Sequence, residues 1–266
     1  MKYCIPFFVG MNSIKEIDEI IIKYKENRYD TLIDFLKERF YVRVIVNMLE
    51  RTLTEKDIEF FAALAEKGEY NFSLLLSYHA NKDLIPQLKE TKIRYFFQEY
   101  CAEWGAVAAF IEMGVSDIYV VNDLGFELRK VSEFAHSVGV KVRAFPNVAQ
   151  EMYPSTDPIT RFFIRPEDIH LYEPYIDVCE IFGDAGITEN IYYIYKDGKW
   201  VGAINGLISN VEEDCVNTFL LENFAFPRIN CGRKCKKGKD CNFCMKKVKI
   251  AKGIDRIRQG AAKNLS

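Results

Sequence analysis

The sequence predicts an α/β fold in which eight parallel strands close into a TIM-type (β/α)8 barrel over residues 1–186. Short runs rich in Val, Ile, Phe and Tyr alternate with segments of helical period along this part of the chain. The runs are almost continuously apolar, as expected for strands that are buried on both faces. Alternating strands and helices favour a parallel sheet, and eight such units in under 200 residues favour a compact barrel over a doubly wound open sheet.

The first expected strand is the N-terminal run YCIPFFV. In chain order the strands are expected at 3–9, 41–48, 71–78, 93–98, 117–121, 140–145, 161–164 and 177–182. We interpret the first run as a strand and not as a secretion signal, because it is short and lacks a small-residue cleavage site. No run approaches the roughly 18 apolar residues of a membrane span, so no membrane association is expected. No Gly-rich phosphate-binding loop follows any strand, which weakens a nucleotide-binding interpretation.

Helical periodicity and capping residues predict the helices between these strands. They are expected at 13–39, 54–67, 81–90, 101–113 and 125–138, with a short helix that begins at Pro166. Ser13 is the expected N-cap of the first helix, with Glu16 as its capping-box partner, and Thr54 is the expected cap of the second. Asn27 and Asp30 indicate a break that would divide the first helix in two.

Residues 187–266 are expected to form an extension that caps the barrel and not an independent domain. The segment 188–208 predicts a helix, a turn at Asp197–Gly198 and a further apolar run. A basic helix is expected at 246–258, near the end of the chain.

Four of the eight cysteines lie within fourteen residues, in the run CGRKCKKGKDCNFC. They are Cys231, Cys235, Cys241 and Cys244. Thiolates this close together usually share a metal, so the run predicts either a [4Fe–4S] cluster or one Zn²⁺ ion. The C-x3-C-x5-C-x2-C spacing differs from zinc ribbons, from ferredoxins and from the radical-SAM motif, and a zinc knuckle that only fixes the tail is the plainer alternative. With no secretion signal, a reducing cytoplasmic setting is expected in place of a disulfide scaffold.

Charge is distributed unevenly along the chain. Residues 231–258 hold eleven Lys and Arg against two Asp and Glu, a net charge of +9, whereas the remainder holds 25 basic and 36 acidic residues, a net charge of −11. The lysines between the cysteines, including Lys236, Lys237 and Lys239, are candidates for contacts with RNA phosphates. The same charges would also offset an anionic thiolate–metal centre or dock on the acidic remainder of the chain.

Polar residues follow several predicted strands at their carboxyl ends, where the active site of a parallel barrel lies. These residues are Asn47, His79, Gln98, Glu99, Asn122, Asp123, Asn147, Gln150, Arg165, Glu167 and Asp184. Asn47, Glu99, Asn122, Arg143 and Asn147 are expected to bind substrate. His79, Asp123, Arg165 and Glu180 are expected to be catalytic. The alternative is that Asn, Asp and His at these positions cap helices, form turns or lie at the surface.

Arg143 and Arg165 are expected within a strand or at its end, where a charge is costly to bury without a partner. Glu180 in the run CEIFG is the expected partner of Arg165. A structural ion pair is one interpretation, and an anion pocket built from Arg143 and Arg165 is the other.

The segments SDIYVVNDLGFEL, VRAFPNV, RFFIRPEDI and DVCEIFG resemble, in this order and spacing, the peptidase U32-like proteins. The resemblance covers about residues 70–184 and implies a (β/α)8-type barrel and a [4Fe–4S] cluster on four cysteines. By match, Arg165, Glu180 and Gly183 occupy the family's Arg, Glu and Gly positions. The family's cysteine motif is expected soon after the last strand but is absent after Gly183; the four cysteines here come some fifty residues later.

The resemblance implies an enzyme that acts on RNA in a hydroxylation-type modification, or an accessory of one, because relatives hydroxylate RNA bases or assist ubiquinone hydroxylation. A zinc-stabilised module that binds nucleic acid or protein on a barrel scaffold is the alternative. A U32-type peptidase is a lesser alternative, since no nucleophile–His–Asp arrangement is found in the sequence.

Overall fold

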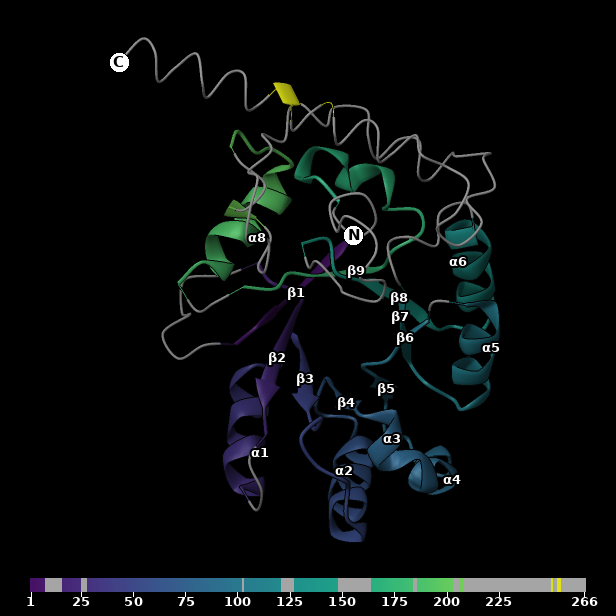
Figure 1. Ribbon diagram of the computed structural model, residues 1–266. Helices are drawn as coiled ribbons and strands as arrows, with labels where there is room; N and C mark the ends of the chain where they lie inside the picture. Colours follow the sequence, from purple (N-terminus) through teal and green to yellow (C-terminus); the bar gives the residue numbers. More distant parts are fainter. Residues whose placement is uncertain are drawn as a thin grey trace. The chain divides into compact units, whose positions relative to one another are not determined.

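The computed structural model describes residues 1–7, 16–24, 28–101, 103–120, 127–147, 164–183, 186–202, 206–207, 250 and 253–254 (Figure 1). The chain forms two compact units that alternate along the sequence. The first unit consists of Met1–Val121, Val131–Ala144 and Ile176–Glu180, and it contains every strand that the structure describes. The predicted boundary between residues 186 and 187 stays a prediction.

All strand pairs of the sheet are parallel, which confirms the predicted α/β class. Within the described residues the strands are β1 (Lys2–Pro6), β2 (Glu19–Lys23), β3 (Arg43–Asn47), β4 (Phe72–Leu76), β5 (Tyr95–Phe97), β6 (Tyr100–Cys101), β7 (Asp117–Val120), β8 (Lys141–Ala144) and β9 (Val178–Glu180). Their order in the sheet is β5-β4-β3-β2-β1-β9-β8-β7-β6. The first strand therefore lies between the second and the last.

The two edges of this sheet approach each other. The backbone N–H of Ser116, directly before β7, donates to the carbonyl of Tyr95 in β5 over 2.8 Å, and the Ser116 hydroxyl donates to the same oxygen over 3.2 Å. The nine described strands thus form a nearly closed, barrel-like sheet, as the alternation of strand and helix predicted.

Helices follow the strands along the chain. The described helices are α1 (Tyr29–Glu38), α2 (Glu55–Lys67), α3 (Tyr78–Asn81), η1 (Lys82–Leu84), α4 (Ile85–Lys89), α5 (Trp104–Glu112), α6 (Glu127–Ser137), η3 (Pro166–Leu171) and α8 (Thr188–Asp197). Thr54 caps α2 as predicted, because its hydroxyl accepts from the Asp57 N–H over 3.3 Å and its own N–H donates to the Asp57 carboxylate over 2.8 Å. Within the first unit, α5 and α6 meet through the rings of Trp104 and Phe134, whose centroids lie 5.2 Å apart. No helix of the described residues is both long enough and apolar enough to cross a membrane.

The predicted helix over 13–39 is wrong in its middle part. Glu19–Lys23 forms β2, which pairs with β1 on one side and β3 on the other, and α1 begins only at Tyr29. The run EIIIK holds three consecutive isoleucines, and β-branched side chains favour a strand with two paired neighbours over a helix. Ser13 and Asn27 lie outside the described residues.

The strand predicted at 161–164 falls almost entirely outside the described residues. Its last residue, Ile164, belongs to no strand, although its N–H donates to the carbonyl of Pro146 over 2.9 Å. The other predicted strands correspond to β1, β3, β4, β5, β7, β8 and β9. β2 was therefore the strand that the sequence analysis missed, and β6 is a short addition after β5.

Described by itself, the second unit contains η3 and α8 in the places that the sequence predicted. Gly198 ends α8 with a positive φ of 64°, which an L side chain adopts only with strain. The Tyr195 hydroxyl on this helix donates to the carbonyls of Ile164 and Pro146, over 2.7 and 3.3 Å. These bonds hold α8 against the backbone at Pro146 and at Ile164.

Candidate functional site

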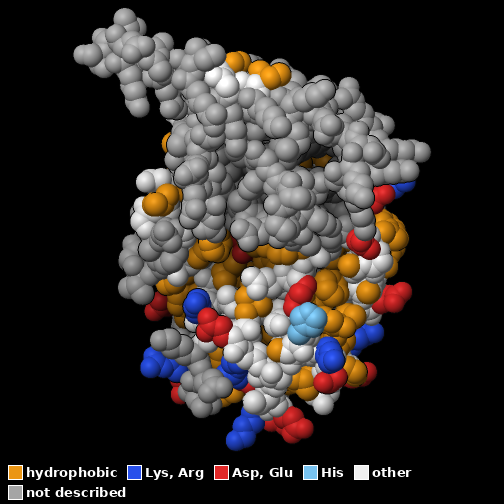
Figure 2. Space-filling view, viewed as in Figure 1, with side chains coloured by type: hydrophobic (Ala, Val, Ile, Leu, Met, Phe, Trp, Pro, Cys, Tyr) orange, Lys and Arg blue, Asp and Glu red, His pale blue; other side chains and the backbone are white. Residues whose placement is uncertain are grey.

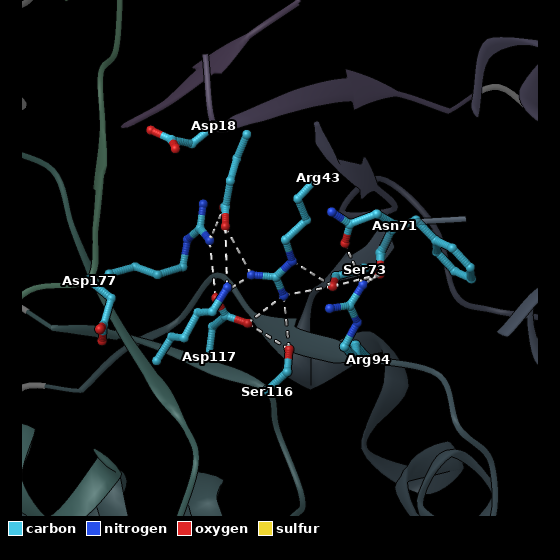
Figure 3. Close-up of polar contacts among 12 residues, drawn as sticks. Asp18, Arg43, Asn71, Ser73, Arg94, Ser116, Asp117 and Asp177 are labelled. Atoms are coloured by element: carbon cyan, nitrogen blue, oxygen red, sulfur yellow. Dashed lines mark hydrogen bonds and ion pairs between the residues drawn. The ribbon is translucent and has the colours of Figure 1, made fainter. Parts of the chain in front are cut away.

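Charged side chains from β2, β3, β7, β8 and β9 meet in the interior of the sheet. Figure 3 shows the part of this cluster around Arg43 and Asp117. We call this cluster the barrel network; its members are Glu19, Arg43, Ser73, Ser116, Asp117, Tyr119, Arg143 and Glu180. All of these side chains are buried except that of Ser116, which is half-buried. Because charge inside a protein is costly unless it is paired, the pairing within this cluster determines what it can do.

Two guanidinium groups and two carboxylates form the centre of the barrel network. Arg43 donates to both oxygens of Asp117 over 2.8 and 2.7 Å and to Glu19 over 3.2 Å. Arg143 donates to Glu19 over 2.6 Å and to Asp117 over 3.1 Å. Each carboxylate thus contacts both arginines, and the four charges balance.

The hydroxyls of Ser73 and Ser116 and the ring of Phe96 complete this centre. Arg43 also donates to the Ser73 hydroxyl over 2.7 Å, and the Ser116 hydroxyl donates to Asp117 over 2.6 Å. The guanidinium carbons of Arg143 and Arg43 lie 4.9 and 5.9 Å from the ring centroid of Phe96, a cation–π arrangement. The geometry therefore holds both cations from several sides.

The ionisation of the centre follows from these contacts. Burial alone would raise the pKa of Asp117 and of Glu19, but the two arginines outweigh burial and lower the pKa of both carboxyls. Burial opposes the charge of Arg143 as well, yet Glu19 and the groups beside it raise its pKa. All four groups are thus charged at neutral pH. Because Glu19, Arg43 and Asp117 are the first residues of their strands, this centre lies at the amino ends, where a parallel barrel builds stability and not catalysis.

Glu180 occupies a different position, at the last residue of β9. Its Oε2 accepts from the Tyr119 hydroxyl over 2.5 Å and lies 3.5 Å from Nη2 of Arg143. Burial, the largest effect, raises the pKa of Glu180 despite the nearby Arg143, and burial together with Glu180 raises the pKa of Tyr119. The sequence had suggested Arg165 as the partner of Glu180; the partners found here are Tyr119 and Arg143.

Three predicted residues lie at the carboxyl ends of strands in the first unit. Asn47 accepts from the Leu49 N–H over 3.0 Å and so forms a turn. One oxygen of Glu99 accepts from the Tyr78 N–H over 2.8 Å, while the other, Oε2, is buried without a hydrogen-bond partner among the described residues. His79 is exposed, next to the ring of Tyr78. Glu99 therefore keeps one oxygen for a further donor, whereas the amide oxygen of Asn47 is engaged.

The predicted residues of the second unit serve local structure. Arg165 donates to Asp168 over 2.5 and 2.8 Å. Asn147 donates to the carbonyls of Phe182 and Leu207 over 2.5 and 3.0 Å and accepts from the Phe182 N–H over 2.9 Å. These contacts favour the structural ion pair for Arg165. Arg143 of the first unit is 0% exposed and paired with Glu19, Asp117 and Glu180, so it is likewise not open to an anion.

The remaining predicted residues lie outside the described part of the chain, so their roles stay predictions. They are Asn122, Asp123, Gln150, Asp184, the four cysteines Cys231, Cys235, Cys241 and Cys244, and the lysines Lys236, Lys237 and Lys239. Within the described residues no group of three or more His, Cys, Asp or Glu side chains is placed to hold a metal.

The sequence analysis missed a Ser–His–Asp chain of contacts. His136 Nε2 lies 2.8 Å from Oδ2 of Asp177, and its Nδ1 lies 3.4 Å from the hydroxyl of Ser132. Ser132 is only 1% exposed, and the same Asp177 oxygen accepts from the Val142 N–H over 2.8 Å. This series of contacts therefore connects α6 to β8 through Asp177, and the buried Ser132 is not presented as a nucleophile. The spacing of Ser132 and His136, four residues apart on a predicted helix, was the available signal.

No family model matches the sequence, and neither the curated proteins nor the solved structures contain a match to it.

Proposed function

We propose that this chain is a metal-dependent barrel enzyme of the peptidase U32-like type, in which Cys231, Cys235, Cys241 and Cys244 hold a [4Fe–4S] cluster. Its substrate is RNA or a related polyanion, and its reaction, or the reaction that it assists, is a hydroxylation-type modification. The observation that carries the proposal is the occurrence of four cysteines within fourteen residues on a chain that otherwise builds a parallel, barrel-like sheet.

The sheet supports a full (β/α)8 barrel if β5 and β6 are counted as one strand. Only Gln98 and Glu99 separate Phe97 from Tyr100, and β5 and β6 each contact β7 or the residue before it. Eight strands then remain, in an order that follows the chain around the sheet. In such a barrel the substrate is bound at the carboxyl ends of the strands, where Glu99 and His79 lie.

The donor set fits a metal. Four thiolates complete the ligands of a [4Fe–4S] cluster or of a tetrahedral zinc, and the eleven basic residues in 231–258 would offset their negative charge. A bound cluster would supply electron transfer or structural support. Glu99 Oε2, which has no hydrogen-bond partner among the described residues, would accept a hydrogen bond from a substrate, such as the amino group of an RNA base.

The basic run is the proposed contact with RNA, since the described surface carries charges of both signs. Figure 2 shows basic and acidic side chains interspersed over the part of the face where α1 and α2 lie. Exposed charges of the described residues also pair with each other, as Lys37 does with Asp34 and Lys92 with Glu66. A surface of this kind does not attract a polyanion, so Lys236, Lys237 and Lys239 would do so.

The basic run also favours a second candidate, a zinc-stabilised module that binds nucleic acid or protein. Metal analysis separates the two. The full chain, purified without oxygen, should be brown and contain iron and acid-labile sulfide, and the variant Cys235→Ser should lose most of both. Cys215→Ser, a cysteine outside the run, is the matched control and should keep them. One zinc per chain and no colour would establish the second candidate instead, and no metal at all would remove both.

A further inference from the structure

The barrel network contains more carboxyl groups than its arginines can neutralise. Arg43 and Arg143 contact three buried acids: Glu19, Asp117 and Glu180. Glu19 and Asp117 each lie within 3.2 Å of both guanidinium groups. The positive charge of the two arginines is therefore already balanced before Glu180 is counted.

Glu180 is also the most weakly paired of the three acids. Its distance of 3.5 Å to Arg143 is the longest of the buried ion pairs in the barrel network, against 2.6 Å for Glu19 and 2.7 Å for Asp117. Its closest partner is a neutral hydroxyl, that of Tyr119, at 2.5 Å. A carboxylate in this place would be a buried charge with little compensation, and such groups bind a proton instead.

Most of the described side chains around Glu180 are neutral or acidic, and Arg143 of β8 is the exception. Cys4 of β1 pairs in register with Glu180 and, on its other side, with Glu19 of β2. Tyr119 of β7 contacts Glu180 as well, and the charge of Glu180 adds to burial in raising the pKa of Tyr100 of β6. The one cation among these described neighbours is Arg143 of β8, and the nearby Lys141 lies at the rim, 37% exposed and 3.6 Å from Glu19. Arg143 is thus the cation nearest to Glu180 among these neighbours, and it also pairs with Glu19 and Asp117 at shorter distances.

We infer that Tyr119 and Glu180 form a proton-donor pair inside the sheet, in which Glu180 keeps its proton at neutral pH. Because Glu180 is the last residue of β9, the pair lies toward the carboxyl ends of the strands, where parallel barrels bind their substrates. This inference goes beyond the proposed function, since all of its groups belong to strands and none depends on a metal or on RNA. The raised pKa of Glu180, due first to burial, agrees with this.

Unfolding as a function of pH tests the inference. The folded-state pKa of Glu180 is raised, so the proton stabilises the native state below the unfolded-state pKa of about 4.3 and this stabilisation is lost as pH rises toward the folded-state value. In Glu180→Gln this dependence disappears, because the amide has the shape and charge of the protonated acid. The ratio of the wild-type unfolding constant to that of Glu180→Gln should therefore rise, by up to about tenfold per pH unit, from about pH 5 to neutral pH.

Glu19→Gln is the matched control, because it makes the same chemical change at an acid that contacts both arginines. It should lose stability strongly at neutral pH, whereas Glu180→Gln should be at least as stable as the wild type. A ratio that stays flat or falls with pH overturns the inference. A Glu180→Gln protein that fails to fold, or that loses as much stability as Glu19→Gln, overturns it too.

Infrared spectroscopy gives a readout that does not depend on stability. At neutral pH the wild-type protein should show the carbonyl stretch of a buried, protonated carboxylic acid, and this band should be missing in Glu180→Gln. In Tyr119→Phe the band should shift, because its hydrogen-bond partner is gone. No band in the wild type, or the same band in Glu180→Gln, would show that Glu180 is ionised or that another acid carries the proton.

Discussion

Asp117 and Arg43 meet through two parallel hydrogen bonds of 2.8 and 2.7 Å although 74 residues separate them in the sequence. The pair connects the first residue of β7 to the first residue of β3, across the interior of the sheet. Such a two-bond contact between a guanidinium and a carboxylate fixes both distance and orientation. It makes the barrel network a determinant of how the strands are placed.

The variant Asp117→Asn should destabilise the protein. Removing one partner of a buried ion pair leaves the other charge uncompensated, at a cost of about 3–5 kcal/mol. Urea denaturation followed by circular dichroism measures the loss. Glu50→Gln is the control, because Glu50 pairs with Lys23 at the surface and both side chains are more than three quarters exposed. Equal stability of the two variants would contradict a structural role for Asp117.

Acid should weaken the protein through the same centre. The folded-state pKa values of Glu19 and Asp117 lie below their unfolded values of about 4.3 and 3.9, so both groups stabilise the native state above that range. This contribution is lost as pH falls through the unfolded-state values toward the folded-state values. The free energy of unfolding, measured from pH 7 down to pH 3, should fall steeply below about pH 4.5, and less steeply in Asp117→Asn. Parallel curves for the two proteins would rule out Asp117 as a source of the effect.

The cap of α2 should contribute a measurable part of the stability. Thr54→Ala removes the hydroxyl that accepts from the Asp57 N–H, and the expected cost is about 1 kcal/mol. Thr52→Ala, at an exposed residue two positions earlier, removes the same atoms without a cap and should leave the denaturation midpoint unchanged. If both variants lose the same stability, the cap is not the cause.

RNA affinity should depend on the lysines of the basic run. Changing Lys236, Lys237 and Lys239 to Glu should weaken binding uniformly across sequences and lower the slope of log affinity against log salt by about two, because three phosphate contacts are lost. The control reverses Lys56, Lys67 and Lys82, three exposed lysines of the described surface, and should leave the slope unchanged. Filter binding over a series of salt concentrations measures both. Binding that ignores salt would remove the RNA interface.

The sequence predicted the alternation of strands and helices well, because the apolar runs of β3, β4, β7 and β8 are bounded by polar or glycine residues. It failed at β2, since Glu16, Glu19 and Lys23 around the isoleucines also fit a helical period, and only the pairing with β1 and β3 decides between the two structures. The local pattern of apolar and charged residues does not show which strands pair in the folded protein.

The sequence predicted that a buried arginine would pair with an acid, but not which acid it would meet. The cost of burying Arg143 indicated that it needs an acid. Which acid it meets depends on the stagger of the strands around the sheet, which brings Glu19, 124 residues away, to 2.6 Å. Arg43 and Asp117 were not singled out, because each is a single charge at the start of an apolar run and looks like a residue of an exposed strand end.

The pairing of Lys2 with Val178 sets a condition on how the chain can fold during synthesis. Until residue 180 has left the ribosome, β1 has one open edge and β8 has another, and both present unpaired backbone groups that join readily to other strands. The sheet therefore cannot join β1 to β8 before β9 has been made. A nascent chain that stalls or is cut before β9 should aggregate, and chaperones that cover strand edges should raise the yield of this protein more than extra time for folding does.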